Sequence, residues 1–95
     1  MSNIDEIAAK IFAAIDNEDV SETKRLIDEL YDMLLTDLEA VKWVANPANL
    51  TRLHSSLEQL GVPKRMLMLR HRVPNQHRRA IMFVKAMSNG LARIM

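Results

Sequence analysis

Apolar residues recur every three or four positions along most of the chain, from Ile4 to Ile94, and this spacing limits the fold more than any other feature. Because a helix completes a turn in about 3.6 residues, such spacing gathers apolar side chains on one side of a helix. No stretch alternates apolar and polar residues as a half-buried strand would. The pattern predicts an all-α protein.

Several helix starts are marked by capping patterns. Asn3, Asp19 and Thr36 are each followed three residues later by a glutamate, which is the arrangement of a capping box. Asn46 stands before a proline, the residue favoured in the first turn of a helix. Asn75 is placed to cap a last helix. The third pattern predicts that the long apolar stretch after Asp19 bends or restarts near Thr36.

Helix ends are marked less often. Gly61 follows the leucines at positions 50, 53, 57 and 60 and suits a C-terminal cap. Residues 88–90, Ser-Asn-Gly, have the composition to end the last helix early. Residues 63–74 stand between two prolines, which we expect to bound a further short helix. We therefore expect a compact bundle of five or six helices that forms a single domain of residues 1–95 and opens with an antiparallel hairpin.

Composition narrows the class of protein. Ninety-five residues suffice for one modest core, and the absence of cysteine excludes disulfides, thiolate metal sites and a cysteine nucleophile. The first ten residues, MSNIDEIAAK, carry acids where a signal peptide carries bases. No apolar run approaches the ~18 residues that span a bilayer. We expect a soluble, cytoplasmic protein that does not enter a membrane.

Charge is divided between the two halves of the chain, although the net charge is only +1. Residues 1–41 contain eleven acids and three bases, whereas residues 42–95 contain ten bases and a single acid, Glu58. Such a division is typical of a protein whose basic half meets nucleic acid or a membrane. It is equally expected if the two halves neutralise each other, within one chain or between two copies.

Patterns typical of catalysis and metal binding are absent from the sequence, which has no Gly-rich phosphate loop, His-Glu-x-x-His or Gly-x-Ser-x-Gly. His54 is adjacent to two serines, but neighbouring helical residues do not face each other. The acids within residues 28–32 are expected on a solvated face. His71 and His77 lack the spacing of helical metal ligands. We predict no enzyme, no metal, no cofactor and no small-molecule substrate.

The segment of residues 63–74, PKRMLMLRHRVP, packs four apolar residues between basic pairs. On a helix, Met66, Leu69 and Val73 share one side, which we expect to face the core. Lys64, Arg65, His71 and Arg72 share an arc of about 120° on another side. More bases follow in the first turns of the last helix, with Lys85 one or two turns further on. We expect phosphate contacts through Lys64, Arg65, Arg70, Arg72, Arg78 and Arg79.

Residues 57–72, LEQLGVPKRMLMLRHR, resemble a helix-turn-helix motif, with Gly61 in the turn and the basic segment in the position of the recognition helix. The resemblance departs from the usual pattern at Leu57, where close helix crossing normally requires a small residue, and at Arg70, where an apolar residue is expected. The resemblance implies that the basic segment is the part that contacts DNA.

Methionines are concentrated in the last third of the chain, which holds five of the seven. Met68 and Met82 are expected to point away from the apolar sides of their own helices, and Leu67 is also off the main apolar face. Methionine adapts to irregular protein surfaces. We therefore predict a partner interface that includes Leu67, Met68 and Met82, and we expect a homodimer.

Two functions remain open. The first is a small non-enzymatic regulatory protein that binds nucleic acid through the basic C-terminal surface. The second is a protein interaction module, such as an inhibitor, adaptor or assembly chaperone, that uses the acidic N-terminal hairpin or the methionine-rich surface and binds no nucleic acid. The clustering of bases around one predicted turn favours the first. The nucleic-acid-binding function loses its main support if the arc of Lys64, Arg65, His71 and Arg72 packs against the carboxylates of residues 16–39 of the same chain.

Overall fold

The computed structural model describes residues 3–65 and 74–95. These residues form helices and no strand. The helices are α1 (Asn3–Asp16), α2 (Val20–Leu34), α3 (Leu38–Ala45), α4 (Pro47–Gln59) and α6 (Gln76–Ile94). The predicted all-α bundle is confirmed. The short helix predicted within residues 63–74 falls mainly on residues 66–73, which lie outside the described part of the chain.

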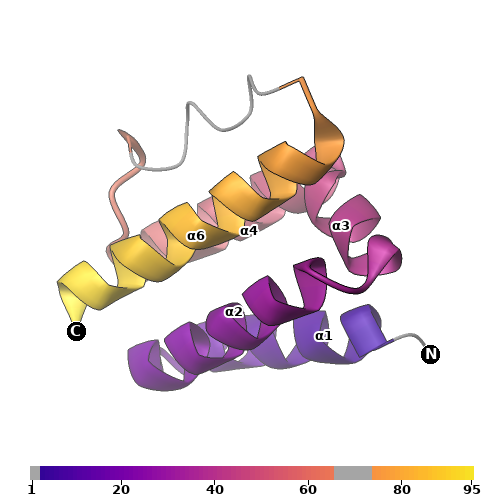
Figure 1. The fold of residues 1–95 in the computed structure, drawn as a ribbon. Helices are drawn as coiled ribbons and strands as arrows, with labels where there is room; N and C mark the ends of the chain where they lie inside the picture. The colour runs from indigo at the N-terminus through magenta and orange to yellow at the C-terminus, as the bar shows by residue number, and fades with distance from the viewer. Residues whose placement is uncertain (1–2, 66–73) are drawn as a thin grey trace.

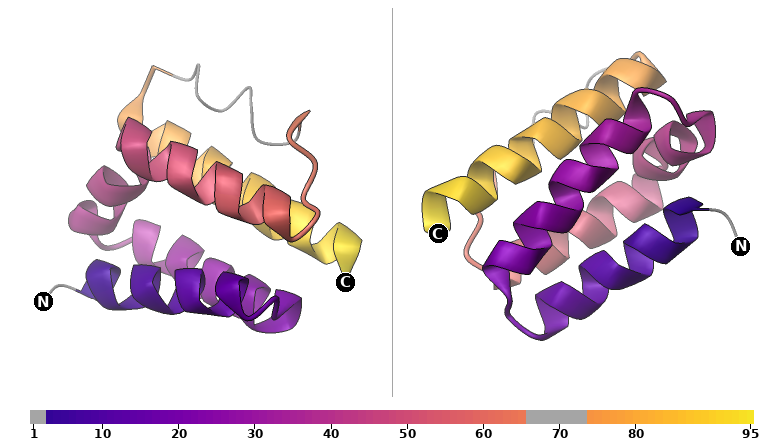
Figure 2. Two further views of the ribbon diagram at one scale, coloured as in Figure 1. Left: turned by 180° about the vertical axis from the view of Figure 1, so that it is seen from behind. Right: turned by 60° about the horizontal axis from the view of Figure 1, so that its bottom comes forward.

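The bundle is arranged around α2, which packs against α1 on one side and α6 on the other (Figure 1). α1 and α2 form the predicted antiparallel hairpin, and α6 runs antiparallel to α2 (Figure 2). α3 crosses one end of the bundle, and both α4 and α6 begin at that end. α4 and α6, both in the basic half, therefore point the same way along the bundle.

Side-chain caps start the helices close to the predicted positions. The Asp19 carboxylate accepts a hydrogen bond of 3.0 Å from the backbone N–H of Glu22 at the start of α2. The predicted restart near Thr36 occurs, but the cap is the next residue, Asp37, which accepts from the N–H groups of Glu39 and Ala40. Thr36 lies in the turn that follows α2, where its N–H donates to the carbonyl of Met33.

α4 has the predicted signals at both ends. Asn46 accepts a hydrogen bond of 2.9 Å from the N–H of Ala48. At the other end, Gly61 adopts a φ of +101°, a conformation that residues with a Cβ rarely adopt. The N–H of Gly61 donates to the carbonyl of Glu58, and the N–H of Val62 donates to that of Leu57. This pair of bonds is a Schellman motif, which ends the helix and turns Val62 into the core.

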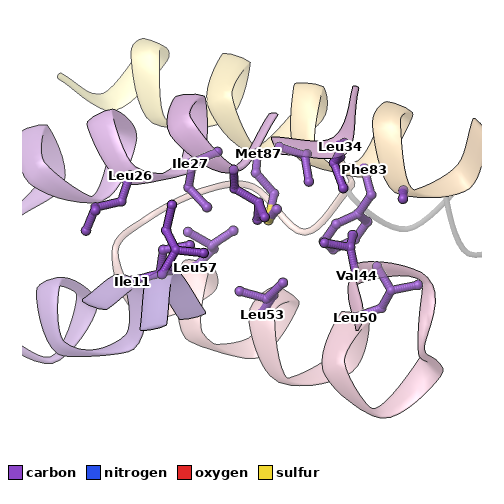
Figure 3. Packing of buried hydrophobic residues seen from close by; sticks show 14 of the residues in the cluster. Ile11, Leu26, Ile27, Leu34, Val44, Leu50, Leu53, Leu57, Phe83 and Met87 are labelled. Carbon is purple, nitrogen blue, oxygen red and sulfur yellow. The ribbon is translucent and has the colours of Figure 1, made fainter. Parts of the chain in front are cut away.

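One apolar core joins all five described helices (Figure 3). Leucines 50, 53 and 57 of α4 are buried, as predicted, and Leu60 packs against the same core. α6 does not end at residues 88–90 but continues to Ile94. Continuing past Gly90 buries Leu91 completely. Burying a leucine stabilises by about 1.5–3 kcal/mol, which exceeds the helical cost of a glycine of about 1 kcal/mol.

A polar contact also links α2 to α6. The Ser88 hydroxyl donates a hydrogen bond of 2.5 Å to the Asp28 carboxylate, which also accepts one of 2.7 Å from Lys24. Burial alone would raise the pKa of Asp28, but the hydrogen bonds from Lys24 and Ser88 outweigh it and hold that pKa below its ordinary value. The ionised carboxylate therefore stabilises the contact between the two helices.

This contact predicts a pH-dependent effect of Ser88→Ala. Near neutral pH the substitution should lower the free energy of unfolding by about 1 kcal/mol or less, because the carboxylate that loses its donor is partly exposed. A carboxyl whose pKa is lower in the folded state contributes fully above its unfolded value of about 4 and loses that contribution as the pH falls through the folded value.

Urea denaturation of wild-type protein and of the variant at several pH values measures the difference. Ser55→Ala, at an exposed position of α4, is the matched control and should be neutral. A difference between wild type and Ser88→Ala that stays constant into strong acid would contradict the proposed role of the Asp28 carboxylate.

Candidate nucleic-acid interface

The structure places four of the six predicted phosphate-contacting residues. Lys64 and Arg65 are exposed in the segment that follows α4, and Arg78 is exposed in the first turn of α6. Arg79 is half-buried beside Arg78. The other two, Arg70 and Arg72, lie outside the described residues.

The described bases do not form one cluster. α4 and α6 begin at the same end of the bundle, so the segment of residues 60–65 lies toward the end at which α6 finishes (Figures 1 and 2). α6 has 19 residues and is therefore about 28 Å long. Lys64 and Arg65 are consequently near one end of α6, whereas Arg78 and Arg79 are at the other. The prediction of a single basic turn does not hold for these four residues.

Arg79 forms a structural contact. Its guanidinium donates a hydrogen bond of 3.1 Å to the backbone carbonyl of Ala45, the last residue of α3. The carbonyls at the C-terminus of a helix lack helical partners and carry partial negative charge, which a cation stabilises. Arg79 thus ties the start of α6 to the end of α3, and part of its hydrogen-bonding capacity is used inside the fold.

The exposed bases of α6 form a stripe along its length. Arg78, Lys85 and Arg93 are all exposed, and they lie seven and eight residues apart. At about 100° per residue they fall within an arc of about 80°. Their spacing along the axis is about 11 and 12 Å. Residues 76–94 contain no aspartate or glutamate, so no carboxylate of α6 interrupts this basic stripe, which consists of Arg78, Lys85 and Arg93.

Three bases of α2 and α3 have carboxylate partners close by in the sequence. Lys24 pairs with Asp28, Arg25 with Glu22 and Glu29, and Lys42 with Glu39. In residues 3–65 and 74–95, no carboxylate forms an ion pair with Lys64, Arg65 or any base of the α6 stripe. Lys64 and Arg65 are therefore not seated against the acidic hairpin, whereas His71 and Arg72, the rest of that arc, lie outside the described residues.

The first turn of α6 adds a favourable site for an anion. The Asn75 side chain accepts a hydrogen bond of 2.9 Å from the N–H of Arg78, which caps the helix. That turn contains no acid, whereas α1, α2 and α3 each have at least one acid in the first turn. Arginines at a helix N-terminus are unfavourable with respect to the helix dipole. A phosphate there would interact favourably with both the arginine and the helix.

Sequence reasoning missed Arg93 as part of this surface. Ending the last helix at residues 88–90 removed Arg93 from the helix, and with it the alignment with Arg78 and Lys85. The absence of acids from residues 76–94 and the spacing of seven and eight residues were visible in the sequence and would have identified the stripe.

Two side chains of α4, those of His54 and Arg52, have structural contacts. The His54 imidazole lies 2.9 Å from the Glu58 carboxylate, one turn along α4. Arg52 stacks over the Phe12 ring at 3.8 Å from its centroid, joining α4 to α1. Met82, from the predicted partner interface, is half-buried, and Leu67 and Met68 lie outside the described residues. Across the described ranges, no group of three or more His, Asp or Glu is placed to hold a metal ion.

Comparison with known proteins gives no relative. No protein-family model matches the chain, and no curated protein or solved structure is significantly similar to it. None of the helices in the described residues has the length and apolar character needed to cross a membrane.

The two neighbouring arginines should differ in their effect on stability. Arg79→Ala should lower the free energy of unfolding by about 1–2 kcal/mol, because it removes a charged donor from the Ala45 carbonyl. Arg78→Ala, one residue away and exposed, should change it by less than about 0.5 kcal/mol. Chemical denaturation followed by circular dichroism measures both. Equal effects of the two substitutions would show that the bond to Ala45 does not stabilise the fold.

Proposed function

We propose that this protein is a small non-enzymatic nucleic-acid-binding protein that contacts the phosphates of a duplex through the basic stripe of α6. One observation supports this proposal above the others: Arg78, Lys85 and Arg93 are exposed on one side of a helix that contains no acid. Several carboxylates of residues 1–41 pair with nearby bases or cap helices, and no ion pair among the described residues joins a carboxylate to the basic stripe. The basic stripe is therefore available to an external anion.

The spacing of the stripe suits an extended polyanion. The three bases cover about 23 Å of helix axis, which corresponds to about seven base pairs at about 3.4 Å per base pair. A mononucleotide or a single phosphate could engage only one of the bases. Lys and Arg neutralise backbone phosphates and release condensed counterions, and these contacts carry no sequence information. We therefore propose binding that tolerates many sequences.

Reversing two charges of the stripe tests this function. Lys85→Glu with Arg93→Glu should weaken binding to a labelled duplex at least tenfold at low salt. The slope of log K against log salt should become shallower by about two, because two phosphate contacts are lost. Fluorescence anisotropy over a series of salt concentrations gives both quantities, and duplex DNA and duplex RNA form two arms of the experiment.

A matched control separates the stripe from net charge. Lys10→Glu with Lys42→Glu makes the same change in net charge at exposed positions of α1 and α3 and should leave the salt slope unchanged. Equal losses in the two double variants would mean that net charge, and not the stripe, drives binding. Absence of binding at low salt by the wild-type protein would refute the function and favour the protein interaction module.

A further inference from the structure

Two exposed leucines form an apolar corner where α2 meets α3. Leu35 is 60% exposed and Leu38 is 61% exposed, although most large apolar side chains of the described residues are buried. In α6, Met82 is half-buried and lies outside the core cluster. These three side chains leave apolar surface that the fold itself does not cover.

The antiparallel packing of α2 and α6 places Leu35 and Met82 on the outer face of this helix pair. Asp28 of α2 is level with Ser88 of α6, as their hydrogen bond of 2.5 Å shows. One turn nearer to α3, Tyr31 and Lys85 line the same shallow pocket. Leu34 of α2 and Phe83 of α6 both belong to the buried cluster beneath this face (Figure 3).

Continuing this register places Asp32 of α2 within one residue, about 1.5 Å along the axis, of the level of Lys85 of α6. Leu35 is likewise within one residue of the level of Met82. Asp32 and Lys85 are both exposed, and within the described part of the chain neither forms an ion pair. The face made by the two helices therefore has a negative edge on α2, an apolar centre and a positive edge on α6.

We infer that this α2–α6 face binds a second copy of the chain, about a twofold axis that runs between α2 and α6 and parallel to them. Such an axis places α2 of each copy over α6 of the other. The rotation leaves the position of every residue along the axis unchanged, so residues at the same level in one copy face each other across the interface. Leu35, which lies on the side of α2 nearer to α6, is then close to the axis, and Asp32 meets the partner's Lys85. The contact is self-complementary, as a twofold interface requires.

The arrangement of charge on the α2–α6 face favours a second copy of the chain over a nucleic acid or a basic protein as its partner. A nucleic acid placed on the face would be repelled by Asp32, and a purely basic protein would be repelled by Lys85. A second copy related by the twofold axis gives both edges a partner of opposite charge at once. Because Lys85 also belongs to the basic stripe, the dimer and the nucleic-acid complex compete for it.

A charge exchange between two variants tests the dimer without nucleic acid. Asp32→Lys puts a lysine opposite the partner's Lys85, and Lys85→Asp puts an aspartate opposite the partner's Asp32. Each variant alone should self-associate at least tenfold more weakly than wild type in sedimentation experiments. An equimolar mixture of the two should recover a dimer, because each interface then contains two Lys–Asp contacts. An ion pair within one copy would not be restored by mixing.

Two further variants serve as controls. Asp16→Lys makes the same charge change as Asp32→Lys at an exposed position at the end of α1 and should dimerise like wild type. Leu35→Ser with Leu38→Ser should dissociate the dimer while circular dichroism shows retained helix. A wild-type protein that stays monomeric at high concentration would overturn the inference, as would a mixture of the two charge variants that stays monomeric. Either result leaves duplex binding untouched.

Discussion

The apolar seam between α2 and α6 is the contact on which the rest of the structure depends. It joins the acidic half of the chain to the basic half, and it buries side chains that come from Ile27, Leu30, Leu34, Phe83, Val84 and Met87. Each such side chain stabilises the fold by about 1.5–3 kcal/mol when fully buried. α1 covers the other side of α2, while α3 and α4 complete the core at one end and along its length.

This seam explains why two halves of opposite charge share one fold without neutralising each other. Because the sides of α2 and α6 that face the core are apolar, most of their charged residues lie on the outer sides, and Asp28 lies at the margin of the seam, where it accepts from Ser88. Ion pairs between described residues form within α2, α3 and α4, three or four positions apart. The surplus of acids therefore stays on the surface of the hairpin and the surplus of bases along α6. Both surfaces remain available to partners. We propose that the basic stripe of α6 binds nucleic acid, and that the α2–α6 face, with Asp32 on one edge and Lys85 on the other, binds a second copy of the chain.

Local chemistry made most of the fold predictable, whereas tertiary contacts decided the rest. Caps and apolar spacing act within one or two turns, so the hairpin and the helix starts follow from the sequence. Adjacent Thr36 and Asp37 are both suitable caps, and only the folded chain shows which one is used. Burial of Leu91 carries α6 past Gly90, and this extension aligned Arg93 with the other bases. The contact of Arg79 depends on a carbonyl 34 positions away, which no local pattern reveals.

Backbone amide resonances of isotope-labelled protein, followed during titration with a short duplex at low salt, show directly whether α6 supplies the phosphate contacts. If it does, the largest shift changes occur at Arg78, Lys85 and Arg93, α1 changes little, and added salt reverses the changes. Changes concentrated in α1 and the outer side of α2, or no changes at low salt, would contradict phosphate binding by α6.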